Sequence, residues 1–459
     1  MIKGRSITLA LLLLDAAAVV ITYNLMAWSR GLVALSEPRL VALALPLLMH
    51  FFAVYLIDGY SRRTDMMSVT YTSLHIIALL LVMLLTLLLT YAVIPAGFQL
   101  QDSRLVTVLA FLMLIPVTLG YRRYFYRKQM ARKQDRYFLF LGSPENCLAF
   151  KQDCRRNEMT QSVLYATHAT FVPDAPPSPG TAAGTMPPFG EAGAYLKQYA
   201  DQIDAIILRE SSDELPPLVA QKLIELHFSG VPTYTLELFH QVYWRKIPLY
   251  RLNQTWLFQE GFQIAREPVF ERLKRASDLI LSTIGLLLAS LLLPLVALLI
   301  WSEDRGPVFF FQPRVGRNRR IFNIVKLRTM RPDAEGDAYT GANDERITRI
   351  GRFLRLSRLD EAPQLWNVLV GDMSLIGPRA EWVRLVEDYE AKIPCYHFRH
   401  LVKPGITGWA QVNYPYGANL EDTLHKLEYD LYYIRYFSFV LDASIVLKTI
   451  HIMLFGKGR

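Results

Sequence analysis

The chain has 459 residues, 52% of them hydrophobic, with a mean hydropathy of +0.19, a net charge of +9 and a pI near 9.3. This length allows about two to four domains, and the basic excess favours cytoplasmic flanks and an anionic lipid surface. No zinc-finger or RNA-binding motif supports nucleic acid as a partner. The three cysteines (Cys147, Cys154, Cys395) form no C-x-x-C pair, which argues against a disulfide framework or a zinc site.

Four apolar segments fill residues 1–130, and they cover residues 7–28, 41–60, 70–94 and 105–121. Each is close to the roughly 20 residues that a helix needs to cross a bilayer. We therefore expect a four-helix transmembrane bundle. The first segment lacks a clear small-residue cleavage site, so it is interpreted as a span and not as a removed signal peptide.

Basic residues predict the orientation of these segments. Lys3 and Arg5 precede the first segment and Arg62 and Arg63 follow the second. Six more follow the fourth: Arg122, Arg123, Arg127, Lys128, Arg132 and Lys133. Because Lys and Arg concentrate in cytoplasmic loops, both ends of the four-helix unit are predicted to face the cytoplasm. We expect no ionisable residue deep in these segments except His50 and His75, which are interpreted as packing between helices, with a proton relay as the alternative.

A different pattern covers residues 131–250. Short apolar runs at 136–142, 163–167, 205–210 and 231–236 predict strands, and 218–230 predicts an amphipathic helix ending at Gly230. This alternation is typical of a small α/β domain with a parallel sheet. The domain lacks G-x-G-x-x-G, so it is expected to regulate, position or dimerise. The Pro/Gly/Ala-rich stretch 172–190 predicts a disordered insert.

Residues 279–301 form a fifth long apolar segment. A complete crossing here would put all later residues on the far side of the membrane from the basic run that follows the fourth segment. Pro294 removes one helix hydrogen bond and bends the helix, and Ser290 can satisfy part of the exposed backbone. We therefore expect the segment to enter, bend and return to the cytoplasmic face. A fifth span kinked at Pro294 is the alternative.

The sequence after this segment predicts two strands joined at Gly316-Arg317-Asn318, followed by a polar loop up to residue 348. Side chains alternate along a strand, so Lys326 and Arg328 should point the same way. They could then reach one pyrophosphate. A solvated strand face is the alternative.

Residues 349–380 hold the strongest candidate site. Asp360 and Glu361 are adjacent, and Pro363 precedes a helical pattern, so both carboxylates are expected at a helix N-terminus. Five arginines surround them in the sequence: Arg349, Arg352, Arg355, Arg358 and Arg379. Helix capping is the plain alternative for a lone acidic pair, and the cations favour a phosphate site instead.

Two further patterns complete the chain. Lys403-Pro404-Gly405 has the composition of a type II turn, and Gln411 and Asn413 can hydrogen bond to a ligand nearby. The aromatic and apolar tail, residues 430–459, predicts a helix lying in the membrane interface. Burial in the soluble core is its alternative.

Three strings in this order carry a resemblance to a known family: PRVGRNRRIFNIVKLRTM, RLSRLDEAPQLWNVLVGDMSLIGPRA and VKPGITGWAQV. They resemble the bacterial sugar transferases that move a hexose-1-phosphate from a UDP-sugar to undecaprenyl phosphate. The resemblance is to the large form and covers essentially the whole chain. It implies four transmembrane helices over 1–130, a Rossmann-like domain over 131–250, and a monotopic phosphoglycosyl transferase domain over 251–459 with 279–301 as its re-entrant helix.

The resemblance also implies roles for single residues. Asp360 matches the nucleophile that forms an aspartyl-phosphosugar intermediate, and Glu361 matches its partner, linked to Mg²⁺. The implied substrate-binding residues are Lys326, Arg328, Arg355, Gln364, Asn367, Asp372, Pro378, Arg379 and Lys403. One position departs from the family, because its Pro-Arg-Pro is here Pro378-Arg379-Ala380. The arginine remains, so activity is expected, while the loop geometry and sugar choice are open.

The implied product is undecaprenyl-diphosphate-sugar plus UMP, the first step of exopolysaccharide, capsule or O-antigen synthesis, with glucose or galactose as the expected sugar. The implied location is the bacterial inner membrane, as a multi-pass protein with its catalytic domain on the cytoplasmic face. Membrane lipids are further partners, and the α/β domain and helix unit offer surfaces for a homodimer. The alternatives are a non-catalytic nucleotide-sugar sensor or scaffold, and a transporter or polymerase, which the few spans disfavour.

Overall fold

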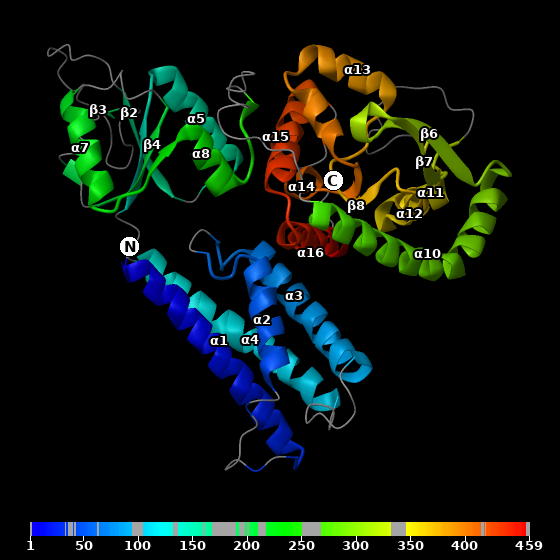
Figure 1. Ribbon diagram of the computed structural model, residues 1–459, viewed down its shortest axis with the longest axis horizontal. Coiled ribbons are helices and arrows are strands. Elements are labelled where there is room, and N and C mark those ends of the chain that lie inside the picture. Colours follow the sequence, from blue (N-terminus) through cyan, green and yellow to red (C-terminus); the bar gives the residue numbers. More distant parts are fainter. Residues whose placement is uncertain are drawn as a thin grey trace. The chain divides into compact units, whose positions relative to one another are not determined.

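The computed structural model describes residues 2–32, 34, 40, 43–61, 64–93, 104–131, 136–157, 159, 161–167, 190–191, 198–199, 202–209, 217–249, 268–331, 346–414, 417 and 419–455. The chain forms two compact units (Figure 1). The first consists of Met1–Leu43, Tyr60–Ser68 and Leu112–Arg245, and the second of Ala44–Gly59, Val69–Phe111 and Lys246–Arg459.

In the first unit, a buried ion pair joins helix α1 (Ile2–Ser29) to the later part of α4 (Arg104–Ala131). The Arg122 guanidinium donates to both carboxylate oxygens of Asp15 at 2.9 and 2.7 Å, and both side chains are 0% exposed. The Tyr60 hydroxyl also donates to Asp15. The prediction that His50 and His75 are the only ionisable residues deep in the apolar segments is wrong, because Asp15 is buried within the first one, and Arg122 was counted only as a flanking charge. That reading of Arg122 is incomplete, because a carboxylate inside an apolar helix needs an opposite charge beside it.

The first unit also holds the α/β domain, and its parallel sheet is confirmed. The strand order is β3-β2-β1-β4-β5, with every pair parallel, which is the order of the first five strands of a doubly wound sheet. The strands are β1 (Tyr137–Leu141), β2 (Ser162–Thr167), β3 (Gly190–Glu191), β4 (Ile203–Leu208) and β5 (Thr233–Thr235). The predicted insert lies outside the described residues except for Gly190, which begins β3.

Alternating side chains of β1 fill the two faces of this sheet. Leu139 and Leu141 pack toward α7 (Pro217–Phe228), and Phe138 and Phe140 pack toward the other face. That face is covered by two helices, α5 (Pro144–Arg156) and α8 (Leu236–Phe239), and by the π-helical turn η6 (His240–Trp244) that continues α8. Figure 1 shows α7 on one face of the sheet and α5 with α8 on the other. The predicted helix at 218–230 is confirmed, whereas α5 was not predicted.

The second unit contains the apolar helices α2 (Ala44–Leu56) and α3 (Val69–Leu88), and α3 continues through the π-helical turn η2 (Leu89–Val93). Four described helices are long and apolar enough to cross a membrane: Thr8–Ser29, Val69–Ala92, Arg104–Lys128 and Val269–Asp304. The expected segment 41–60 differs, because its helix α2 has only 13 residues. His50 and His75 are both buried. The packing of all four segments into one bundle stays a prediction.

Helix α10 (Pro268–Asp304) contains the predicted fifth segment and has Pro294 inside it. Its 37 residues would span about 55 Å if straight. Near its start, Lys274 pairs with Asp442 at 2.6 Å, and at its end Asp304 pairs with Arg328. Figure 1 shows the ribbon changing direction before it reaches β6. Both ends therefore attach to one domain, while only 6% of the apolar window is buried, which favours the re-entrant interpretation.

The remainder of the second unit forms the domain that carries the candidate site. Its strands are β6 (Phe309–Val315), β7 (Ile321–Leu327), β8 (Ser374–Ile376) and β9 (Gly405–Thr407). Its helices and helical turns are η8 (Arg317–Arg319), α11 (Arg349–Ser357), η9 (Leu359–Glu361), α12 (Gln364–Val370), α13 (Val383–Lys392), η10 (Tyr396–Leu401), α14 (Trp409–Asn413), α15 (Leu420–Tyr436) and α16 (Phe439–Phe455). β6 and β7 form the antiparallel pair predicted around Gly316. The polar loop that was expected next falls largely outside the described residues.

Two expectations about this domain need correction. The tail is not one helix, because α15 packs into the core of the domain and only α16 lies against the apolar helices α2 and α3. Gly405 does not take the left-handed conformation of a type II turn. It belongs to β9, and a Cβ there would lie 2.1 Å from the Gly377 nitrogen, so close backbone approach is what requires glycine.

Candidate active site

The acidic pair lies in a tight turn between two helices. Thr348 caps α11 by accepting a hydrogen bond from the Gly351 nitrogen at 2.9 Å, and Arg358 ends that helix with a φ of 58°. The chain then forms the 3₁₀ turn η9, and Pro363 occupies the N-cap position of α12. Asp360 and Glu361 therefore precede α12 directly, as expected, but on a 3₁₀ turn of their own.

The Asp360 side chain is half-buried and lies in the field of several charged groups. Its Oδ1 is buried and has no hydrogen-bond partner among the residues that the structure describes. Burial, and then the charge of Glu361, raise the pKa of Asp360 above its ordinary value, and the cations Lys326, Arg355 and Arg358 oppose that shift. A carboxyl with one unpartnered oxygen and several cations nearby could attack an anionic substrate as a nucleophile.

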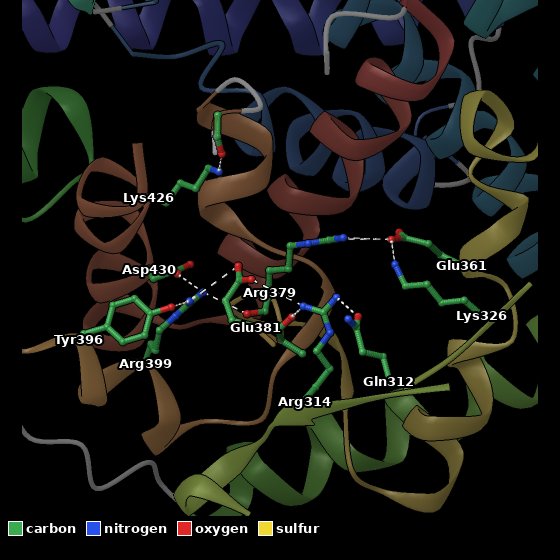
Figure 2. A network of polar contacts seen from close by, with 12 residues as sticks. Gln312, Arg314, Lys326, Glu361, Arg379, Glu381, Tyr396, Arg399, Lys426 and Asp430 are labelled. Atoms are coloured by element: carbon green, nitrogen blue, oxygen red, sulfur yellow. Dashed lines mark hydrogen bonds and ion pairs between the residues drawn. The ribbon is translucent and has the colours of Figure 1, made fainter. Parts of the chain in front are cut away.

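Glu361 has the opposite environment. Its Oε1 accepts from Lys326 Nζ at 2.8 Å and from both terminal nitrogens of Arg379 at 3.4 Å, as Figure 2 shows. Its Oε2 lies 3.9 Å from Arg358 Nη1. Burial alone would raise the pKa of Glu361, but these charges and the Lys326 hydrogen bond hold it well below its ordinary value. The folded structure therefore favours the ionised form of Glu361.

Arg379 reaches Glu361 from the loop that follows β8. The loop is tied to β9, because the Gly377 nitrogen donates to the Thr407 carbonyl at 2.9 Å and the Gly405 nitrogen donates to the Pro378 carbonyl at 2.8 Å. Pro378 thus supports the loop through its carbonyl. Ala380, where the family has proline, is 4% exposed and packs in the core formed by β7, α12 and β8.

The remaining predicted cations are placed differently from one another. Arg355 donates from Nε to Thr329 Oγ1 at 2.9 Å and contributes to the field at Asp360. Arg328 follows the end of β7, and its Nη1 donates to Asp304 Oδ2 at 2.7 Å. Lys326 and Arg328 were expected to point the same way and reach one pyrophosphate. In the structure each is paired with a different carboxylate, Lys326 with Glu361 and Arg328 with Asp304.

The three polar residues that follow the acidic pair have different surroundings. Gln364 is buried, and its Nε2 has no hydrogen-bond partner among the described residues. Asn367 accepts from the Val325 nitrogen at 3.0 Å and donates to the Asn323 carbonyl at 2.8 Å, so its amide ties α12 to β7. Asp372 lies in the turn after α12, where its nitrogen donates to the Asn367 carbonyl at 3.0 Å.

Lys403 lies near the other end of α12. Its Nζ is 3.6 Å from the position that a Cβ on Gly371 would take, beside Arg275, which donates to the last carbonyls of α12. Gln411 donates to the Ile406 carbonyl and Asn413 to the Trp409 carbonyl, so both amides also bond the local backbone. One cluster is thus formed by the acidic pair with Lys326, Arg355, Arg358 and Arg379. Arg328 and Lys403 have other immediate neighbours.

Sequence reasoning missed a second layer behind this cluster. Arg399 donates to the Arg379 carbonyl at 3.0 Å and to Asp430 Oδ2 at 2.9 Å, and both side chains are buried. Arg314 donates to the Ala380 carbonyl at 3.1 Å. These residues come from η10, α15 and β6 (Figure 2), so no local spacing could have associated them. A buried arginine and aspartate inside an otherwise apolar helical pattern were the available signals.

Sequence comparisons give the same region a family. A sequence model described as "Bacterial sugar transferase" matches residues 269–456. A protein of Aeromonas hydrophila named UDP-N-acetylgalactosamine-undecaprenyl-phosphate N-acetylgalactosaminephosphotransferase is 38% identical over 261 residues, which is 56% of this chain and 61% of that protein.

Two other relatives match shorter stretches of the chain. The UDP-glucose:undecaprenyl-phosphate glucose-1-phosphate transferase of Escherichia coli is 45% identical over 184 residues, 39% of each chain. The exopolysaccharide production protein PSS of Rhizobium leguminosarum is 42% identical over 186 residues, which cover 39% of this chain and 93% of that protein. The match therefore spans less than two thirds of the first two relatives and nearly all of the third.

Proposed function

The chain belongs to the bacterial sugar transferase family, and from this premise we propose that it transfers a sugar-1-phosphate from a UDP-sugar to undecaprenyl phosphate. Relatives named for this kind of transfer support the proposal. The observation that carries it is the Asp360 carboxyl, whose buried Oδ1 lacks a protein partner among the described residues. Three cations that act on it, Lys326, Arg355 and Arg358, suit a reaction between anions.

The proposed reaction has two steps at Asp360. In the first, a carboxylate oxygen attacks the phosphorus next to the sugar, the bond from that phosphorus to the bridging oxygen breaks, and UMP leaves with the electron pair. In the second, a phosphate oxygen of undecaprenyl phosphate attacks the same phosphorus and releases Asp360. A covalent intermediate divides one difficult transfer between bulky anions into two easier displacements.

Glu361 and its cations prepare the site for this chemistry. The Glu361 carboxylate keeps Lys326 and Arg379 together at one point. Their charges can then stabilise the phosphate oxygens in the transition state, and the arginine can offer two parallel hydrogen bonds.

Magnesium is part of the proposal, and the donor set fits it in part. Among the described residues, no group of three or more His, Cys, Asp or Glu side chains is arranged so that it could hold a metal ion by itself. Glu361 Oε2 is the oxygen that could hold the ion, with phosphates and water as its other ligands. When bound, Mg²⁺ would neutralise pyrophosphate charge and stabilise the leaving UMP.

The membrane-associated helices suggest where the two substrates meet. Several leucines along α10 are more than half exposed, including Leu287, Leu291 and Leu295, as expected for a helix in contact with lipid. We infer that α10 re-enters the inner membrane and returns, which leaves the domain on the cytoplasmic face. The lipid phosphate would then arrive from the bilayer and the UDP-sugar from the cytosol, the first step of a surface glycan.

The test is UMP release by detergent-solubilised protein supplied with undecaprenyl phosphate and Mg²⁺. The panel of donors is UDP-glucose, UDP-galactose and their N-acetylated forms. We expect UMP from one or a few donors, with glucose or galactose first, and loss of release in Asp360→Asn. The matched control is Asp388→Asn, which changes a carboxylate on α13 that is 49% exposed and should release UMP at the unchanged rate.

A second measurement reads the intermediate directly. With a radiolabelled sugar-phosphate donor and no acceptor, label should remain on the protein and be removed by hydroxylamine, as expected of an acyl phosphate. No UMP from any donor, in protein with a normal melting curve, would overturn the proposal in favour of the sensor interpretation. Release of UMP that persists in Asp360→Asn would overturn the assigned nucleophile.

A further inference from the structure

Two arginine side chains donate hydrogen bonds to successive backbone carbonyls of the loop that carries Arg379. Arg399 Nη2 donates to the Arg379 carbonyl at 3.0 Å, and Arg314 Nη1 donates to the Ala380 carbonyl at 3.1 Å. Guanidinium groups usually pair with carboxylates or phosphates, and two of them on adjacent carbonyls form a local clamp. The clamp lies on the opposite side of Arg379 from its contact with Glu361 (Figure 2).

Acidic side chains hold the two clamping arginines in place. Glu381, the next residue in the loop, lies between them, with its oxygens 3.9 Å from Arg399 and 3.7 Å from Arg314. Asp430 accepts from Arg399 at 2.9 Å, and the Asp430 side chain is 2% exposed. The Arg399 guanidinium is therefore fixed by groups from α15 and from the loop, and it cannot turn away without leaving buried charges unpaired.

Backbone hydrogen bonds to β9 hold the other side of the loop. With the carbonyl of Pro378 bonded to Gly405, and those of Arg379 and Ala380 bonded to the arginines, three successive carbonyls have assigned donors. These hydrogen bonds restrict the backbone at Arg379. From there the Arg379 guanidinium reaches Glu361, with Nη2 3.4 Å from Oε1.

We propose that Arg399, fixed by Asp430 and Glu381, is a positioning residue that sets the Arg379 guanidinium for the phosphates of the donor. This inference rests on the proposed function, because it takes Arg379 to bind the donor's phosphates. Arg399 acts through the Arg379 carbonyl and makes no contact with substrate. Lysine could supply the charge but not the planar set of donors that joins one carbonyl to two carboxylates.

The test is a double-mutant cycle on donor use and donor binding. The variants are Arg399→Lys, Arg379→Ala and the double variant, and the readouts are kcat/KM for the UDP-sugar and Kd for UDP with Mg²⁺. We expect Arg399→Lys to lower kcat/KM roughly 10- to 100-fold, since displacing a binding group by about 1 Å has effects of that order. In the Arg379→Ala background the same change should have less than about a twofold effect.

Controls separate positioning from folding. Arg319→Lys changes an arginine of the same domain that is 61% exposed and should leave both readouts unchanged. If Arg399→Lys does not fold, Arg314→Lys, at a side chain 14% exposed, is tested in the same two backgrounds and must show the same coupling. Equal fold-losses in both backgrounds, no loss in either, or unfolding of both variants would overturn the proposal, because the network would then be structural only.

Binding distinguishes this inference from the proposed function. Protein that binds UDP with the expected coupling but releases no UMP would refute the transfer reaction and keep the positioning role. Protein that releases UMP but shows no coupling would refute the positioning role alone. Protein that neither binds UDP nor releases UMP would overturn both.

Discussion

Replacing Lys326 by methionine should destabilise the domain through Glu361. Lys326 Nζ is 2.8 Å from Glu361 Oε1, and the two side chains are only 16% and 10% exposed. Removing one partner of a buried ion pair usually costs about 3–5 kcal/mol, because the other charge stays buried. Arg379 at 3.4 Å and Arg358 at 3.9 Å still face Glu361, so we expect a smaller loss, about 2–3 kcal/mol.

Thermal unfolding in detergent, followed by tryptophan fluorescence, measures this loss. For a domain of this size, 2–3 kcal/mol corresponds to a fall in Tm of about 4–12 °C. The double variant Lys326→Met/Glu361→Gln should be more stable than the sum of its single changes by about 1–3 kcal/mol, because it leaves neither member of the pair charged. Lys392→Met, at a helix-surface pair with Asp388, should change stability by less than about 0.5 kcal/mol.

The pH dependence of stability tests the Lys326–Glu361 pair independently. The folded-state pKa of Glu361 lies below its ordinary value of 4.5, so its ionisation contributes stability above that value, and this contribution is lost as the pH falls. The difference in Tm between wild type and Lys326→Met should therefore become smaller as the pH is lowered. A Tm loss no larger than that of Lys392→Met, or single changes that simply add, would refute the assignment of Lys326 as the main partner of Glu361.

Three more predictions concern other parts of the chain. The rate of UMP release should fall as the pH is lowered, with its midpoint above the ordinary aspartate pKa of about 3.9, because Asp360 must be ionised to attack and its pKa is raised. A pH–rate profile with its midpoint at or below about pH 4 would contradict this. Asp15→Ala and Arg122→Ala should each destabilise the fold by about 3–5 kcal/mol if the remaining charge stays buried, which lowers the yield of folded, protease-resistant protein. The double change should recover part of the lost stability. Gly405→Ala should lower Tm and activity together, whereas Gly120→Ala, where a Cβ meets nothing within 4 Å, should not.

Local sequence patterns predicted much of this fold because they depend on neighbours in the chain. Alternating and continuous apolar runs identified β1, β2, β4 and β5 of the parallel sheet and the β6–β7 pair. The acidic pair was found in front of α12 because Pro363 and the helical spacing that follows are local signals. The 13-residue length of α2 was not predicted, because hydropathy marks an apolar stretch and not the point where its helix ends.

Contacts between distant segments could not be predicted in the same way. Strand alternation predicted a shared direction for Lys326 and Arg328, but Arg328 lies beyond the last residue of β7, and the end of α10 supplies Asp304 as its partner. The pair of Asp15 and Arg122 joins residues 107 positions apart. Sequence spacing contains no information on such pairs, whose energy arises only when the tertiary fold removes both charges from water.

The acidic pair itself shows how position on one turn separates two chemically similar groups. Glu361 accepts hydrogen bonds from Lys326 and Arg379, and its pKa is lowered. Asp360, one residue earlier, keeps an unpartnered oxygen among the described residues, and its pKa is raised by burial and by Glu361. A nucleophile needs an oxygen that no protein group occupies, whereas a residue that holds cations must keep its charge, so the two environments suit the two proposed roles and not the reverse. Exchanging the two residues, Asp360→Glu with Glu361→Asp, would keep the charges and shift both carboxyl groups, and we expect it to abolish UMP release.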